Sequence, residues 1–331
     1  MKRSEFIKAG LASAAILPLS RTGSQNHGKR YQFPVLAFGV CADIHHDFYP
    51  NVPAKLARFI ADMQTKSPDF IIQLGDFCTP EPKNRELMDI WNRFEGTKLH
   101  VIGNHDPEMQ FTQEQVARFW GMPAPYHSLD LNGYHLVILD GNEVNPAHEK
   151  RIKYEHYISE KQLQWLEADL DATDSYTLIF CHQAIDINGL DNALSVRVLL
   201  DRVNQKAGFQ KVQAVFSGHH HRDCYNHING IHYFQVNSMC YDWNVAYGDN
   251  PYDEATTKQF PLIKNMSHYK DPLWAYVTID NQGRLTLKGR KTVFLGKSPY
   301  ENGMSRQQYY YEVKPEISDK EVMLRHELQK I

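Results

Sequence analysis

Short apolar runs alternate with helix-like patterns along the first third of the chain. Residues 34–43 (PVLAFGVCAD) are almost entirely apolar, which indicates a buried strand ending at Asp43. Residues 53–66 carry apolar side chains three and four positions apart, the spacing of an amphipathic helix. The same order continues with a strand at 69–76, a helix at 84–95 and a strand at 98–103. A β-α-β-α-β order predicts a mainly parallel sheet covered by helices.

The middle of the chain carries clear start and turn signals. Thr112 and Gln115 have the spacing of a capping box, so a helix is predicted to begin there, and Ser159 opens another. Asn132-Gly133 between two apolar runs predicts a hairpin. Further strands are predicted at 176–182, 211–218 and 230–238, a hairpin at 273–289, and an amphipathic helix from Ser318 to the end.

Two long polar segments rich in aromatic residues interrupt this order, at 142–157 and 241–272. Loops of this length in a compact domain tend to be either functional or disordered. Their aromatic rings either stack on a base or sugar of a substrate or pack the loops onto the body of the protein.

The N-terminus differs from the rest of the chain. Residues 1–20 (MKRSEFIKAGLASAAILPLS) place basic residues before a run of small apolar ones, the pattern of an export signal that is too short to span a bilayer. It resembles a twin-arginine signal, but Ser4 stands where the second arginine belongs. We expect export to a bacterial periplasm or cell envelope; an amphipathic first helix and a cytoplasmic protein are the alternative.

Composition narrows the function classes. The net charge of −3 argues against a nucleic-acid partner, because no basic excess is available to follow a phosphate backbone. Five cysteines without a CxxC pair exclude a zinc ribbon and a thioredoxin-type site. The odd count leaves at least one cysteine unpaired, and a bridge between Cys224 and Cys240 is one option.

Five of the predicted strands are each followed by aspartate, asparagine or histidine. These residues are Asp43 and His45, Asp76, Asn104 and His105, His182, and His219 and His221. In open α/β sheets, ligands bind outside the carboxyl ends of the strands, so the side chains are expected to converge. A glycine precedes three of them and permits a sharp turn and a close backbone approach.

The spacing within two of these motifs suggests which side chains share a face. Asp43 and His45 are two positions apart, as are His219 and His221, and such pairs project from one face of an extended backbone. His220 would then point away. Cys181 next to His182 is not read as a nucleophile and base, because adjacent strand residues face opposite sides.

The donor set exceeds what one metal ion needs and fits two divalent cations with one bridging carboxylate. Imidazole and carboxylate donors without a thiolate suit manganese, iron or zinc. Two close cations can clamp the attacking and leaving oxygens of an in-line displacement at phosphorus.

Taken together, the motifs Asp43-x-His45, Gly75-Asp76, Gly103-Asn104-His105-Asp106, His182 and Gly218-His219-x-His221 resemble those of the calcineurin-like metallophosphoesterase family. The resemblance covers about residues 35–290 and implies a four-layer α/β fold, two facing mixed sheets flanked by helices. We therefore expect a signal and linker at 1–30, the metallophosphoesterase domain at 31–295, and a C-terminal extension at 296–331.

The resemblance also implies roles for single residues. The metal ligands would be Asp43, His45 and His221 on the first ion, Asp76 on both ions, and Asn104, His182 and His219 on the second. His105 would stabilise the transition state or donate a proton to the leaving oxygen, and Asp106 would orient its imidazole. Thr79 replaces a tyrosine that purple acid phosphatases use as a ligand, which argues against an iron–tyrosinate centre.

The expected function is hydrolysis of a small phosphate ester through in-line attack of a hydroxide that bridges the metals. A nucleotide-type diester or pyrophosphate fits the aromatic loops, and a phosphomonoester or phospholipid headgroup is the alternative substrate. A nuclease is less favoured because the chain lacks a basic excess. The alternative from another class is a non-catalytic, metal-binding interaction module on the same fold.

Overall fold

The computed structural model describes residues 31–150, 152–307 and 312–328, and these contain two six-stranded mixed sheets. The first, sheet A, has the order β15 (Lys320–Met323), β13 (Arg284–Lys288), β12 (Ala275–Ile279), β1 (Leu36–Cys41), β2 (Phe70–Gln73) and β3 (Thr97–His100). Strands β1, β2 and β3 are parallel, and β12, β13 and β15 are joined antiparallel to them and to one another.

The second sheet, sheet B, has the order β4 (His127–Leu131), β5 (Tyr134–Leu139), β6 (Tyr176–Cys181), β7 (Val212–Ser217), β9 (Ile231–Gln235) and β8 (Cys224–Ile228). Its four central strands are parallel, and both edge strands are antiparallel. The predicted turn at Asn132-Gly133 joins β4 to β5, and both residues have the positive φ (48° and 82°) that a tight hairpin turn of this kind requires.

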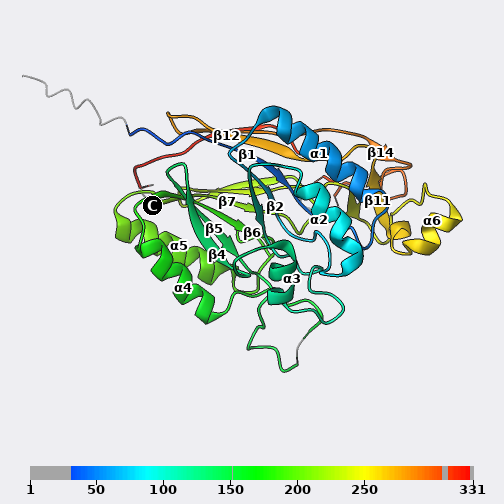
Figure 1. Ribbon diagram of the computed structural model, residues 1–331, viewed down its shortest axis with the longest axis horizontal. Coiled ribbons are helices and arrows are strands. Elements are labelled where there is room, and N and C mark those ends of the chain that lie inside the picture. Colours follow the sequence, from blue (N-terminus) through cyan, green and yellow to red (C-terminus); the bar gives the residue numbers. More distant parts are fainter. Residues whose placement is uncertain (1–30, 151, 308–311, 329–331) are drawn as a thin grey trace, which may run out of the picture. The chain divides into compact units, whose positions relative to one another are not determined.

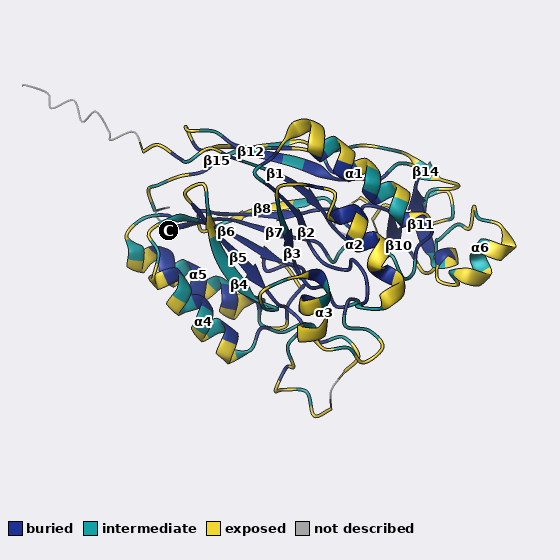
Figure 2. Cartoon of the chain, in the orientation of Figure 1, coloured by how far each residue is buried: buried dark blue, intermediate teal, exposed yellow. Residues whose placement is uncertain are grey.

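The two sheets face one another across a shared apolar core. Phe38 of β1 makes edge-to-face contacts with Phe180 of β6 and Phe216 of β7, with ring centroids 5.9 and 5.3 Å apart. The core side chains of both sheets belong to one buried cluster. Figure 2 shows the central strands mostly in the buried colour and the helices exposed along their outer sides.

Helices cover the outer face of each sheet (Figure 1). Helices α1 (Val52–Lys66) and α2 (Arg85–Trp91) pack on sheet A, where Leu56, Phe59, Ile60 and Met63 are buried as the helical spacing predicts. Helices α4 (Glu160–Asp171) and α5 (Ala193–Ala207) pack on sheet B. The expected four-layer α/β fold with two facing mixed sheets is therefore confirmed.

The predicted helix starts at Thr112 and Ser159 are confirmed. Helix α3 (Gln113–Trp120) begins with a capping box between Thr112 and Gln115, and the Ser159 side chain accepts a hydrogen bond from the Gln162 backbone at the start of α4. These starts follow from local hydrogen bonding, which satisfies backbone N–H groups that the first turn leaves free.

Other expectations for single segments are wrong. The predicted loop 241–272 contains β10 (Tyr241–Trp243), α6 (Glu254–Gln259) and β11 (Met266–Tyr269), and β14 (Phe294–Leu295) joins β10 and β11 in a three-stranded sheet. Helix α5 and strand β8 were not predicted at all. Two short 3-10 helices, η1 (Pro82–Asn84) and η2 (Ile263–Asn265), complete the elements of the described residues.

The predicted C-terminal helix is also wrong, because residues 320–323 form the edge strand β15. Its Val322 pairs with Leu285 of β13, and exposure alternates along the strand. Pairing with the free edge of β13 thus overrides the local helical pattern. The bridge between Cys224 and Cys240 is absent, since all five cysteines, each within the described part of the chain, are free thiols.

The expected export signal lies outside the described residues, and export stays a prediction. Among the described residues, no helix combines the length and the apolar character that crossing a bilayer requires.

Candidate metal centre

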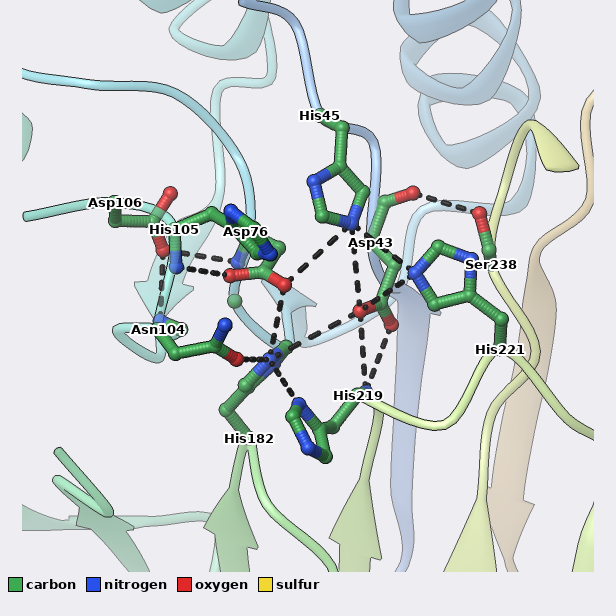
Figure 3. A network of polar contacts seen from close by, with 12 residues as sticks. Asp43, His45, Asp76, Asn104, His105, Asp106, His182, His219, His221 and Ser238 are labelled. Atoms are coloured by element: carbon green, nitrogen blue, oxygen red, sulfur yellow. Dashed lines mark hydrogen bonds and ion pairs between the residues drawn. The ribbon is translucent and has the colours of Figure 1, made fainter. Parts of the chain in front are cut away.

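The residues predicted to converge do so at the carboxyl ends of β1, β2, β3, β6 and β7 (Figure 3). Figure 3 shows Asp43, His45, His221, Asp76 and His182 directed toward one another from the segments that follow β1, β2, β6 and β7. Each position follows the last residue of a strand, so the chain turns where the sheet ends. The convergence predicted from the strand ends is therefore present in the structure.

The backbone reason differs from the expected one. Asp43, His45, Asp76, His219 and His221 all have positive φ, between 52° and 69°. They are therefore in the left-handed region, not in extended backbone, and the argument from side chains alternating along a strand does not apply. Left-handed conformations cost energy for residues other than glycine and cluster at functional sites.

Asp43, His45 and His221 form the first group of donors. The Nε2 atoms of His45 and His221 lie 3.1 Å apart, and His221 Nε2 lies 3.4 Å from Asp43 Oδ1. All three residues are buried. The Asp43 carboxylate also accepts hydrogen bonds from the His219 backbone N–H at 3.1 and 3.0 Å, so its orientation is fixed by the chain that carries the other ligands.

Asp76, His182, His219 and Asn104 form the second group. His182 Nε2 lies 3.2 Å from Asp76 Oδ2, 3.2 Å from Asn104 Oδ1 and 3.3 Å from His219 Nδ1. Asp76 Oδ2 is also 3.4 Å from His45 Nε2 in the first group. The Asp76 carboxylate therefore stands between the two groups, where a bridging ligand would have to be.

The donor atoms are arranged to bind cations and not to form hydrogen bonds with one another. In both groups, ring nitrogens face each other at hydrogen-bond distance, although neutral imidazoles have only one N–H each. His182 Nδ1 must donate to the Leu74 carbonyl at 2.6 Å, and His221 Nδ1 must donate to the Tyr241 carbonyl at 2.9 Å, because a carbonyl only accepts. When these two rings are neutral, their Nε2 lone pairs are directed into the centre, the arrangement found around metal-bound histidines.

Among the described residues, three overlapping groups could hold a metal ion. Their members are Asp43, His45 and His221; His45, Asp76 and His105; and Asp76, His182 and His219, with the donor atoms of each group within 4.8 Å of one another. A mixture of imidazole and carboxylate donors suits first-row divalent cations.

The charges of the centre are strongly coupled. Burial opposes ionisation of Asp76, yet the neighbouring His182, His105 and His45 hold the pKa of Asp76 well below its ordinary value. Burial also disfavours a charged His182, but the Asp76 carboxylate outweighs it and raises the pKa of His182 to about 9. Burial dominates at His45 and lowers its pKa. The Asp76 carboxylate therefore stays ionised, and its negative charge can attract cations.

Glycines make the close packing of these side chains feasible. A Cβ atom at Gly103 would lie 2.3 Å from both Asp76 N and Asp76 Oδ1, and one at Gly218 would lie 2.5 Å from Asp43 Oδ2. Any larger residue would displace a carboxylate of the centre. The predicted need for glycine before Asn104 and His219 is therefore confirmed.

His105 lies at the edge of the centre, but the predicted contact between its imidazole and Asp106 is wrong. The Asp106 carboxylate instead accepts backbone hydrogen bonds from Asp76, Phe77 and Gly103 at 2.9, 2.7 and 2.7 Å. These donors engage both oxygens of the buried carboxylate. Asp106 therefore braces the turns that carry Asp76 and Asn104.

Glu108 makes the contact with His105 that Asp106 was expected to make. His105 Nδ1 lies 2.8 Å from Glu108 Oε1. Tyr154, from the loop between β5 and α4, donates its hydroxyl to the same oxygen. Sequence reasoning missed both residues. Glu108 follows His105 by three positions, so the sequence could have suggested this contact. No signal in the nearby sequence indicates Tyr154.

Two other neighbours complete the picture. The Ser238 hydroxyl donates to the Asp43 backbone carbonyl at 2.7 Å and was also missed. His220 Nδ1 lies 3.2 Å from Gln235 Oε1, so this imidazole is directed to β9. That geometry supports the prediction that His220 is not a ligand.

A cavity of about 690 Å³ adjoins the centre on the side of Asn104. Its lining includes Glu108, Tyr154, Lys153 and Asn142, so it opens between the turn after β3 and the loop after β5. This volume lies in the range of small-molecule binding sites.

The protein has two facing sheets, and a centre rich in histidine and aspartate lies at the ends of their strands. This combination of fold and site is typical of one class of protein. A model of the calcineurin-like phosphoesterase family matches residues 36–223, which is more than half of the chain. The chain belongs to this family. The expectation of an enzyme that hydrolyses phosphoric esters is thereby confirmed, and the alternative of a non-catalytic module loses support.

Two individual proteins resemble the chain. The manganese-dependent ADP-ribose/CDP-alcohol diphosphatase of Arabidopsis thaliana is 24% identical over 270 residues, which cover 62% of this chain and 86% of the relative. The crystal structure of a dimetal phosphatase from Danio rerio matches with a TM-score of 0.56 and 17% identity, covering 78% of this chain and 96% of that one. At that identity the second likeness concerns the fold alone.

Proposed function

We propose that the protein hydrolyses small phosphate esters with two divalent cations bound at the carboxyl ends of strands from both sheets. The observation that carries the proposal is the position of Asp76 Oδ2, 3.4 Å from His45 Nε2 and 3.2 Å from His182 Nε2. One carboxylate oxygen thus belongs to two groups of donors, which supports a pair of cations rather than a single one.

The chain's own residues would divide the work between holding cations and moving protons. The proposed ligands are Asp43, His45 and His221 for one cation, Asp76 for both, and Asn104, His182 and His219 for the other. When bound, two cations supply positive charge to the phosphate and lower the pKa of a coordinated water. His105 stands beside the centre, where its Nε2 can give a proton to the leaving oxygen or stabilise charge on the phosphate.

The proposed substrate class is a nucleotide-type diphosphate or diester, with manganese as the first metal to test. The diphosphatase named above supports both choices, and the cavity of about 690 Å³ has room for a group of that size. The net charge of −3 supports a small substrate over a nucleic-acid strand.

Hydrolysis assays test the proposal. Purified protein is chelated, reloaded with manganese, magnesium, iron or zinc, and assayed with p-nitrophenyl phosphate, bis-p-nitrophenyl phosphate and a panel of nucleotide diphosphates. We expect turnover with manganese, its loss on chelation, and about two metal ions per chain by elemental analysis. Turnover that survives chelation, or a stoichiometry of one, would contradict the two-cation centre.

Export from the cytoplasm is a separate proposal, supported by the basic and apolar pattern of residues 1–20. Cell fractionation of the full-length protein, followed by N-terminal sequencing of the mature form, tests it. A cytoplasmic protein that keeps Met1 or Lys2 at its N-terminus would contradict export.

A further inference from the structure

The imidazole of His105 is held by a cluster that the family motifs do not contain. Glu108 Oε1 receives three donors, namely His105 Nδ1 at 2.8 Å, the Tyr154 hydroxyl, and Lys153 Nζ at 3.4 Å. The Lys153 side chain is 70% exposed, whereas those of His105 and Glu108 are 20% and 18% exposed. The exposed lysine contributes little, so the contacts among His105, Glu108 and Tyr154 carry the cluster.

Aromatic neighbours restrict the same ring from its sides. The Tyr154 ring centroid lies 4.7 Å from that of His105, and the Phe48 centroid lies 5.2 Å away. On the inner side the His45 ring follows at 5.1 Å. The imidazole therefore has one orientation in which Nδ1 reaches Glu108, and Nε2 is the nitrogen left for a substrate.

Glu108 is suited to fix both the orientation and the tautomer of the ring. Burial opposes its ionisation, but the hydrogen bonds from His105 and Tyr154 outweigh burial and lower the pKa of Glu108 to about 2. A carboxylate that accepts a hydrogen bond from Nδ1–H selects one tautomer of the imidazole and holds the ring in place. Asp106 cannot take this role, because three backbone N–H groups occupy its carboxylate.

We propose that Glu108, anchored by Tyr154, is the positioning residue that turns the His105 imidazole toward the leaving oxygen of the substrate. The inference rests on the proposed phosphoester hydrolysis. As a water oxygen forms the new bond to phosphorus and the bond to the leaving oxygen breaks, a proton that His105 Nε2 has taken up from solvent passes to that oxygen, while Nδ1–H stays hydrogen-bonded to Glu108. The water releases a proton to solvent, and the imidazole regains one from solvent.

The dependence of turnover on the leaving group tests this role. Wild type, Glu108→Gln and Tyr154→Phe are compared on p-nitrophenyl and phenyl esters of the same phosphate, because the more basic phenyl oxygen needs its proton more. We expect Glu108→Gln to lower kcat about 10–100-fold on the phenyl ester and clearly less on the p-nitrophenyl ester, since general acids contribute most to poor leaving groups. KM and metal content are expected to stay within twofold.

Tyr154→Phe removes only the hydroxyl and is expected to give the same pattern with a smaller loss, between twofold and tenfold. Glu149→Gln is the matched control, because Glu149 is an exposed glutamate of the same loop. It is expected to keep wild-type kcat on both esters. Equal losses on the two esters, or no loss in Glu108→Gln, would overturn the positioning role.

A spectroscopic measurement separates this inference from the proposed function. Long-range ¹H–¹⁵N spectra of the metal-free, ¹⁵N-histidine-labelled protein report the tautomer of each ring, and His105→Ala identifies the His105 signals. We expect the Nδ1–H form in the wild type and its loss in Glu108→Ala. An unchanged tautomer in Glu108→Ala overturns the inference alone. An intact Nδ1–H signal without metal-dependent hydrolysis by the wild type overturns the proposed function and, with it, the catalytic use of this contact.

Discussion

The donor cluster at the strand ends and the rim beside it, which consists of His105, Glu108 and Tyr154, are built in opposite ways. Asp43 and His182 are 0% exposed and follow directly from central strands. Glu108 lies in a turn and Tyr154 in a long loop, and both line the cavity. The Glu108 side chain is 18% exposed. The proposed metal ligands are therefore part of the buried core. The residues that hold His105 lie on segments that can change without disturbing the core.

This difference separates binding from catalysis. A buried ligand cannot move without disturbing the strand end and the backbone hydrogen bonds around it, so its position is as rigid as the fold. A rim residue is held by a few polar contacts and can be replaced at little cost in stability. Loops carried by a rigid scaffold are where catalytic and specificity residues tend to occur. Changes in the cluster should therefore remove metal, and changes in the rim should alter turnover alone.

The largest effect is expected from Asp76→Asn, which halves the negative charge of the cluster at the atom that joins its two groups. We expect loss of most bound metal and a fall in turnover on the order of 10³-fold, because the cations supply several kcal/mol of transition-state stabilisation. Elemental analysis and the p-nitrophenyl assay measure both. Asp89→Asn on the exposed side of α2 is the control and should change neither. Full metal content in Asp76→Asn would contradict the proposal that this cluster binds the metal ions.

His105→Ala is expected to cut turnover about 10²–10⁴-fold and to leave metal content intact, since a positioned general acid contributes that much. The same two measurements apply, with His227→Ala, an exposed histidine of β8, as the control. If the metal were lost as well, His105 would belong to the cluster and not to the rim.

Gly103→Ala tests whether the cluster depends on close packing. The new Cβ would lie 2.3 Å from Asp76 N and Oδ1, so we expect a loss of about 1–3 kcal/mol in the free energy of unfolding together with weaker metal binding. Urea unfolding of the metal-free protein and a metal titration measure the two effects.

Gly121→Ala serves as the control for the glycine. Gly121 has positive φ (77°), and a Cβ atom at this position would meet no atom from other parts of the chain within 4 Å. The substitution should therefore cost about 1 kcal/mol through backbone strain and leave metal affinity unchanged. Equal metal affinity in both variants would show that Gly103 serves stability only.

The smallest effect is expected from His220→Ala. Its imidazole contacts Gln235 on β9, so metal content and turnover should both stay close to those of the wild type. His219→Ala and His221→Ala, measured alongside, should each lower metal content. If His220→Ala lowered metal content more than the other two substitutions, the prediction that His219 and His221 are ligands and His220 is not would be wrong.

Much of the fold could be predicted from the sequence because interactions between residues close together in the chain determine it. The capping box at Thr112 and the hairpin turn at Asn132-Gly133 act over a few residues, and both predictions are confirmed. The helix α5 was equally readable, because Val196, Leu199, Leu200 and Val203 follow helical spacing and are buried. The edge strand β15 was not, because its partner β13 lies more than 30 residues away in sequence and only pairing turns its residues into a strand.

The sequence by itself determined the chemical inventory of the centre, since aspartate, asparagine and histidine follow five strands and strand ends meet at one edge of a sheet. Tertiary structure alone decided how these side chains turn. Left-handed backbone at residues such as Asp43 and His221 directs them inward, and three backbone N–H groups from two turns hold the Asp106 carboxylate. It also brought Tyr154 to Glu108 across 46 residues, a contact that depends on the packing of two loops and has no local signal in the chain.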